Sequence, residues 1–383
     1  MLLSNVHENS RTRALILLHH PDFKPNFLVF SGLYQSVIDI AFKAAKSNNI
    51  LPGEHLYHLS SFFNDLLKLG FVESDNIPAG INPLLVLIDA PPRRHLESLL
   101  DCFKPRKIIM LLAEHPEHQP SSLKDCIGIS DLLIHPYVIP SHYSVNSSIK
   151  SATYFVYKEI PDTTSASIPH DNNFQFDDSL AFDASIMCSH LLKGHPSLYA
   201  FRRHLINLST RLFADKFAHY GRYWHEKRKL LSLPRTASPI GLARSIRNFR
   251  DVLLYSSPQC DLSRYLGSPA SKAVLLNCKT SFCVENYLTP SGYTTEKALE
   301  PLSYGCMPIY VGGQRDNWIS PFLEVISPDC LSLASRVISY SKYNTHELFD
   351  SVSMIRKSIN DYLADSRNTS LCFLYDNIVA QIL

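Results

Sequence analysis

Short apolar runs alternate with longer mixed segments through the first 150 residues of the chain. Four of these runs have the aliphatic composition of strands, and they occupy residues 14–18, 84–88, 107–112 and 131–135. Between them, residues 37–45 and 56–69 place apolar side chains at helical spacing. Strands that alternate with helices predict an α/β unit with a mainly parallel sheet.

The alternation returns in the second half, after a stretch from 159 to 179 that is rich in Pro, Asp, Asn, Ser and Thr. The elements predicted there are strands at 185–188, near 220–221, at 281–284 and at 307–311, and helices at 198–213 and near 296–304. Residues 345–383 form a long amphipathic stretch that predicts helix.

These patterns divide the 383 residues into four parts. We expect an N-terminal α/β domain over 1–160, a linker over 161–180, a C-terminal α/β domain over 181–345 and a helical tail over 346–383. Two α/β domains joined by a linker predict a ligand site in the cleft between them.

Charge and cysteine content restrict the partners and the compartment. Lys and Arg number 37 and Asp and Glu 35, so the formal net charge of +2 predicts no nucleic-acid partner. The apolar run at 14–18 is much shorter than the ~20 residues that span a bilayer, so we expect no transmembrane segment and a cytoplasmic location. The nine cysteines include no C-x-x-C pair, which predicts reduced thiols in the core.

Missing motifs narrow the chemistry further. Neither G-x-G-x-x-G nor G-x-x-x-x-G-K-[ST] occurs, and the chain has only 13 glycines. Bound phosphates would therefore be held mainly by cationic side chains or helix N-termini. No D-x-D occurs either, which favours a site that requires no metal cofactor and that Mn²⁺ or Mg²⁺ would at most stimulate.

Acidic and histidine residues cluster just after one predicted strand, as Glu114, His115, Glu117 and His118. Their spacing matches no zinc signature, and Pro116 prevents the regular helix that H-E-x-x-H requires. A plain polar loop and a catalytic loop both fit this pattern. Because the carboxyl ends of strands face the crevice in open α/β sheets, Glu114 is a candidate for catalysis.

The densest group of reactive residue types lies between 282 and 312. Its pattern predicts strand, loop, helix, turn and strand, with Thr294 or Thr295 as the cap of the helix. Glu296 and Lys297 would then occupy the first helical turn. A lysine there opposes the helix dipole, so we expect an anion beside it.

This segment resembles the family-10 glycosyltransferases, which are inverting α1,3/4-fucosyltransferases. Their pattern is roughly F-x-x-E-N-S, a short loop, G-Y-x-T-E-K, a helix and G-x-x-P-I-Y-x-G. The matching residues, in order, are Phe282, Glu285, Asn286, Gly292, Tyr293, Thr295, Glu296, Lys297, Gly305, Pro308, Ile309, Tyr310 and Gly312. Two further segments are similar to that family at a lower level: 185–203, which contains Arg202 and Arg203, and 109–120, which contains Glu114.

The resemblance implies an α/β fold of the GT-B type, with two Rossmann-like domains and a cleft between them. It implies GDP-fucose as donor, bound by the C-terminal domain, and a glycan acceptor on the N-terminal domain, with fucose transferred α1,3 to a GlcNAc or Glc unit. Inversion requires a base for the acceptor hydroxyl and positive charge for the leaving diphosphate. The family pattern gives the first role to Glu114 and the second to Lys297 with Arg202 or Arg203.

The same resemblance assigns ribose or fucose binding to Asn286, Tyr293 and Glu296. Glu296 is also given a catalytic role, because its negative charge would stabilise an oxocarbenium-like transition state. Each residue has an ordinary alternative as well. Glu296 would suit any helix terminus, the two arginines would suit a solvated helix face, and Tyr293 would suit a packed turn.

Two departures from the family pattern matter. Tyr287 stands where Ser usually follows E-N, in a loop that is one residue longer than usual, and Pro301 would kink the expected helix or shorten its start. Two other functions therefore stay open. One is a GT-B transferase of the exostosin-like kind that uses a UDP-sugar, and the other is a non-catalytic homologue that binds a nucleotide or a glycan.

Overall fold

The chain forms two compact units in a computed structural model. Unit 1 comprises Met1–Glu159 together with Asn360–Leu383, and unit 2 comprises Ile160–Ile359. The residues that the structure describes are 13–17, 26–49, 57–74, 77–78, 80–114, 119–135, 148–151, 159–164, 180–189, 198–222, 224, 260–269, 272–287, 294–312, 318–365 and 368–382. Most of the predicted linker, 161–180, lies outside them.

Unit 1 is built on a seven-stranded sheet in the order β3-β1-β2-β4-β5-β6-β7. Its strands are β1 (Arg13–Leu17), β2 (Asn26–Gly32), β3 (Phe71–Glu73), β4 (Leu84–Ile88), β5 (Lys107–Leu111), β6 (Leu132–His135) and β7 (Ser148–Ser151). β1 runs antiparallel to both of its neighbours, and the run from β2 to β7 is parallel. Gly32, Ile88 and Leu111 are in register, so the carboxyl ends of β2, β4 and β5 meet at one edge.

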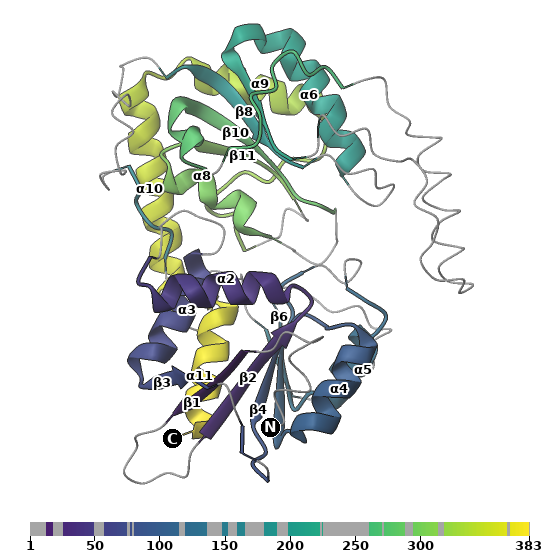
Figure 1. Cartoon of the computed structure of the whole chain (residues 1–383). Coiled ribbons are helices and arrows are strands. Elements are labelled where there is room, and N and C mark those ends of the chain that lie inside the picture. Colours follow the sequence, from purple (N-terminus) through teal and green to yellow (C-terminus); the bar gives the residue numbers. More distant parts are fainter. Residues whose placement is uncertain are drawn as a thin grey trace, which may run out of the picture. The chain divides into compact units, whose positions relative to one another are not determined.

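Helices cover both faces of this sheet (Figure 1). One face carries α2 (Gln35–Lys46), α3 (Tyr57–Lys68) and α11 (Ser370–Ile382), and the other carries α4 (Arg93–Phe103) and α5 (Leu123–Ile129). In the core, Phe62 and Phe63 of α3 meet Phe30 of β2 edge to face. Burial on both faces explains why the central strands are continuous apolar runs.

Unit 2 contains a parallel four-stranded sheet in the order β11-β10-β8-β9. Its strands are β8 (Phe182–Met187), β9 (Phe217–Tyr220), β10 (Cys278–Val284) and β11 (Met307–Val311). On one face, α6 (Tyr199–Phe213) and α9 (Cys330–Ser341) contribute Leu205, Leu333 and Val337 to the core. The 3-10 helix η3 (Lys272–Asn277) belongs to a separate cluster with Cys278 and Tyr304. Two Rossmann-like α/β units are the GT-B architecture that the sequence predicts.

Most predicted elements are found, and some were missed. Strands 84–88 and 307–311 are confirmed residue for residue, whereas β2, β3 and β7 were not predicted. The tail is two helices, α10 (Thr345–Leu363) and α11, rather than one stretch. Residues 360–383 belong to unit 1, because Leu371, Leu374 and Ile378 of α11 are fully buried in its core.

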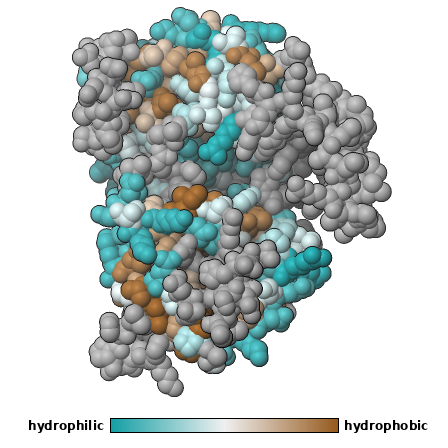
Figure 2. Space-filling model, in the orientation of Figure 1, coloured by the Kyte–Doolittle hydropathy of each residue, from teal (hydrophilic) through white to brown (hydrophobic). Residues whose placement is uncertain are grey.

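The described surface is mixed in character. On the face shown in Figure 2, hydrophilic and hydrophobic residues are interspersed. The most exposed large apolar side chains are Leu331 and Met354, on α9 and α10. None of the helices in the described part of the chain is both long and apolar enough to cross a membrane.

Candidate functional site

A pocket of about 110 Å³ lies at the carboxyl edge of the unit 2 sheet. Its walls come from the ends of β8 and β10, from α6, from η3 and from the segment 296–301. The charged residues that line it are Arg202, Lys272, Glu296, Lys297 and Glu300. Cations and carboxylates at the carboxyl ends of parallel strands suit a ligand that carries both anionic oxygens and hydrogen-bond donors.

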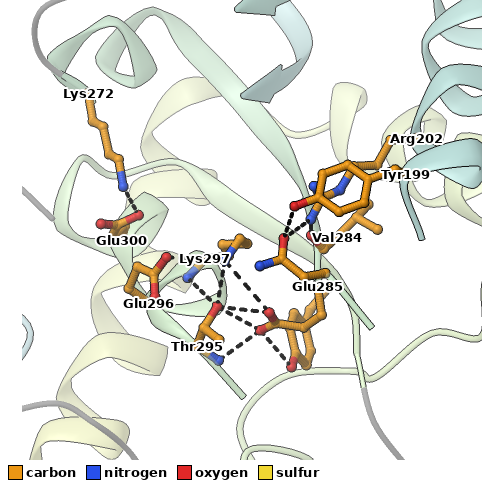
Figure 3. A network of polar contacts seen from close by, with 11 residues as sticks. Tyr199, Arg202, Lys272, Val284, Glu285, Thr295, Glu296, Lys297 and Glu300 are labelled. Atoms are coloured by element: carbon orange, nitrogen blue, oxygen red, sulfur yellow. Dashed lines mark hydrogen bonds and ion pairs between the residues drawn. The ribbon is translucent and has the colours of Figure 1, made fainter. Parts of the chain in front are cut away.

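Arg202 is fixed in orientation by its neighbours (Figure 3). Its guanidinium donates to the carbonyl of Val284 and, at 3.0 Å, to Oδ1 of Asn286. Tyr199 stacks on the guanidinium at 4.7 Å, and its hydroxyl donates to the same Asn286 oxygen at 3.2 Å. Nε of Arg202 is buried and has no hydrogen-bond partner among the described residues. The arginine therefore reaches the pocket in one orientation, with one donor unused.

Arg203 is equally buried, but it is not among the residues that line the pocket. Burial lowers the pKa of its guanidinium, and the nearby Cys260 and Cys188 oppose that effect. Of the two arginines that the sequence left open, the structure brings Arg202 to the pocket.

Lys297 lies in the 3-10 helix η4 (Glu296–Ala298) and not in the first turn of a longer helix. Thr295 caps this turn, since its Oγ1 accepts from the Lys297 amide at 3.4 Å. The helix α8 (Glu300–Ser303) follows, with Pro301 in its first turn, so the predicted helix is shortened as proline requires. The expectation of an anion from the helix dipole is therefore wrong, because so short a turn has no substantial dipole.

The ammonium group of Lys297 instead lies among acceptors (Figure 3). It is 3.0 Å from Oγ1 of Thr295, 3.1 Å from Oε1 of Glu296 and 3.8 Å from Oε2 of Glu285. These contacts favour a lysine at this position even without a ligand. They also leave it at the pocket wall, where a stronger anion could compete for it.

Glu285, directly after β10, has no exposed surface. Its carboxylate accepts from the Thr295 amide at 2.7 Å, from the Thr295 hydroxyl at 2.8 Å and from the Tyr310 hydroxyl at 3.2 Å. Burial raises the pKa of Glu285, and Lys297 lowers it. The sequence matched Glu285 to the family pattern without giving it a role, although a carboxylate at the end of an apolar strand was the available signal. In the structure it anchors the segment that carries Lys297.

A second buried carboxylate, that of Glu300, lines the pocket. It pairs with Lys272 of η3 through Oε2, whereas Oε1 is buried and has no hydrogen-bond partner among the described residues. Burial raises the pKa of Glu300, and Lys272 lowers it. Because an unpartnered buried acceptor is costly, a ligand hydroxyl or amino group that donates to Oε1 would be stabilised.

Glu114 lies in unit 1, half-buried and shortly after β5, at the strand end where the sequence predicts it. Its amide donates to Oδ1 of Asp89 at 2.9 Å, and its carbonyl accepts from Nε2 of Gln119 at 3.3 Å. Neither Asp89 nor Gln119 was singled out from the sequence. The backbone of Glu114 is therefore held by two side chains from neighbouring loops.

Some predicted site residues lie outside the described part of the chain: Tyr293, His115, Glu117 and His118. Within the described part, no three His, Cys, Asp or Glu side chains come together in a way that could hold a metal ion. A site that needs no metal stays a prediction.

No protein-family model matches the sequence, and no curated protein matches it either. Solved structures show a distant likeness. The apo structure of OtsA is 9% identical, with 91% of this chain and 77% of that chain covered at a TM-score of 0.45. A UDP-forming α,α-trehalose-phosphate synthase from Burkholderia xenovorans is 11% identical, with 91% and 78% covered at a TM-score of 0.44. S. aureus TarM in complex with UDP is 10% identical, with 72% and 52% covered at a TM-score of 0.40.

Proposed function

We propose that this protein is a glycosyltransferase that moves a sugar from a nucleotide diphosphate donor to a hydroxyl of a glycan acceptor. The observation that carries the proposal is the unit 2 pocket, where Arg202, Lys272 and Lys297 line one small space together with two carboxylates. Cations placed where a diphosphate departs stabilise the negative charge that develops on it. They also remove the need for a metal ion held by D-x-D.

In this proposal each pocket residue has a stated role. Arg202, already oriented by Asn286, binds the diphosphate, and Lys297 exchanges its contact with Glu296 for a phosphate oxygen. That exchange is easy because the Glu296 side chain is 40% exposed and can turn to solvent or to a sugar hydroxyl. Asn286 positions the arginine, which replaces the ribose-binding role that the resemblance implied.

Transfer with inversion also needs a base for the acceptor hydroxyl, and we propose Glu114 for it. Its carboxylate follows a strand end, where general bases of open α/β sheets are commonly presented. We propose GDP-fucose as the donor on the strength of the E-N and Y-x-T-E-K residues. A UDP-sugar is the second candidate, because the buried Tyr287 stands where the fucosyltransferase pattern has serine.

The deciding experiment incubates the protein with a panel of GDP- and UDP-sugars and measures nucleotide release with and without an acceptor array. We expect acceptor-dependent release from GDP-fucose. The variant Arg202→Lys should lose most of it, and the matched variant Arg203→Lys should keep most of it. Nucleotide binding without any transfer would identify a non-catalytic homologue. Absence of nucleotide binding altogether would refute the proposal.

A further inference from the structure

One buried carboxylate oxygen in unit 1 collects three hydrogen-bond donors. Oδ1 of Asp89 accepts from the amide of Ala113 at 2.8 Å, from the amide of Glu114 at 2.9 Å and from Nε2 of Gln119 at 2.6 Å. Asp89 directly follows β4, and the two amides follow β5, the adjacent parallel strand. The side chain therefore ties together the carboxyl ends of two strands at the edge where Glu114 lies.

The backbone of Asp89 is unusual as well. Its φ of 60° is in the left-handed region, which Gly, Asn and Asp occupy more easily than other residues do. The side chain is only 3% exposed. A buried charge in a strained backbone conformation is retained where the surrounding structure requires that geometry.

Gln119 closes the network from the other side. Its Oε1 accepts from the amide of Ala90 at 2.9 Å, while its Nε2 donates to Asp89 and, at 3.3 Å, to the carbonyl of Glu114. Both ends of the Gln119 amide are therefore used, and Glu114 is held through its amide and its carbonyl. Two contacts on one residue restrict both the position and the rotation of its backbone.

We propose that Asp89 is a positioning residue, which fixes the backbone of Glu114 so that its carboxylate is presented in one orientation for proton transfer. The inference rests on the proposed function through the role of Glu114. Among the charged groups of the described residues, Glu114 is the one that acts on Asp89 through its charge. His95 of α4 makes its hydrogen bond to Ser31, and Arg93 of α4 pairs with Asp125 of α5.

Two variants separate the acceptor from the backbone conformation. Asp89→Asn keeps an oxygen acceptor, and Asp89→Gly removes it, while both residues tolerate a positive φ. We expect Asp89→Gly to lower kcat by ~10- to 100-fold with little change in donor KM, because a small displacement of a reacting group costs that much. Asp89→Asn should restore most of kcat.

Hydrogen–deuterium exchange of the full chain gives a readout that does not depend on activity. Peptides that contain Ala113 and Glu114 should exchange faster in Asp89→Gly and near the wild-type rate in Asp89→Asn. The matched control is Asp131→Asn, because Asp131 accepts the Ile108 amide at 2.7 Å near the other end of β5. That control should leave kcat and the exchange of those peptides unchanged. Unchanged exchange in Asp89→Gly would overturn the inference.

A double-mutant cycle tests whether Asp89 acts through Glu114. In the Glu114→Gln background, Asp89→Gly should lower the residual kcat hardly at all, since the group that it positions has already lost its basicity. An equal loss in both backgrounds would overturn the inference while leaving the proposed function standing. If no nucleotide sugar is turned over by the wild type, the proposed function fails, and the exchange data alone then decide whether Asp89 holds this backbone.

Discussion

The ammonium nitrogen of Lys297 lies 3.8 Å from a carboxylate oxygen of Glu285, a residue with no exposed surface. Glu285 in turn accepts the amide and the hydroxyl of Thr295, two residues before the lysine. Binding and stability are therefore coupled at this lysine. The cation that would meet a phosphate also compensates a buried negative charge in the empty protein.

Replacing Lys297 with Ala should lower both the stability and the affinity for GDP. We expect a loss of about 1–3 kcal/mol in the free energy of unfolding, because Glu285 is left without its cation. Lys297 lowers the pKa of Glu285, so its removal raises that pKa further. The stability deficit should then be small at acid pH, where Glu285 is neutral in both proteins, and grow as the pH rises through the higher pKa of the variant.

Thermal unfolding at several pH values, together with calorimetric titration of GDP, checks this prediction. Lys297→Arg is the control, because it keeps the positive charge. A variant that loses stability but binds GDP normally would limit Lys297 to a structural role.

The two neighbouring arginines should differ in binding. Arg202→Lys removes the planar fork that Val284 and Asn286 orient, so the affinity for GDP and for pyrophosphate should fall by ~10-fold or more. Arg203→Lys should change both affinities much less, since Arg203 does not line the pocket. Equilibrium titration with each ligand compares the pair directly. Equal losses in both variants would contradict the choice of Arg202.

Replacing Glu114 with Gln should reduce turnover by ~100-fold or more, the usual effect of losing a general base. Donor affinity should stay the same, because the proposed donor pocket belongs to unit 2. Steady-state kinetics with a separate measurement of nucleotide binding tests both statements. Turnover close to that of the wild type would move the search for the base to Glu117.

Chelation by EDTA should leave most of the activity intact. In the proposed mechanism the cationic side chains of the pocket neutralise the diphosphate, so that no bound metal is required. Transfer assayed before and after EDTA treatment, and again after addition of Mn²⁺, measures the effect. Complete loss that Mn²⁺ restores would contradict this mechanism, whereas a modest stimulation by Mn²⁺ is compatible with faster GDP release.

Asp89 should make the stability of the protein depend on pH. Burial, with a contribution from the charge of Glu114, raises the pKa of Asp89 from 3.8 to about 7 in the folded state. An acid with a raised pKa stabilises the fold at low pH, and that contribution is lost as the pH rises from about 4 to about 7. We expect a loss of up to about 4 kcal/mol relative to Asp89→Asn, measured by denaturant unfolding across this range. A difference that does not vary with pH would show that Asp89 has the same pKa in both states.

The sequence predicted best those elements whose residues face a single environment. Residues 84–88 and 307–311 are buried along their whole length, so a parallel strand between two helical layers leaves a continuous apolar run. β2 carries a similar run, 27–30, but so few residues cannot be distinguished from a buried loop or helical segment by periodicity.

The site was predicted less completely, because its geometry depends on contacts distant in sequence. Motif residues located Arg202 and Asn286, which are 84 positions apart and share a hydrogen bond. No local pattern marks Asp89, since its importance comes from a positive φ and from amides on the adjacent strand. Lys297 was placed correctly in the pocket but for a reason that Pro301 removes.

The helix α11 gives the chain an order of completion during synthesis. Unit 2 is continuous from Ile160 to Ile359, so every residue of its core has been made before the last segment leaves the ribosome. Unit 1 begins first but lacks Leu371, Leu374 and Ile378 until the end. The part of the protein that is translated first is therefore the last to close its core, and the newly made chain carries an uncovered apolar sheet face until α11 arrives.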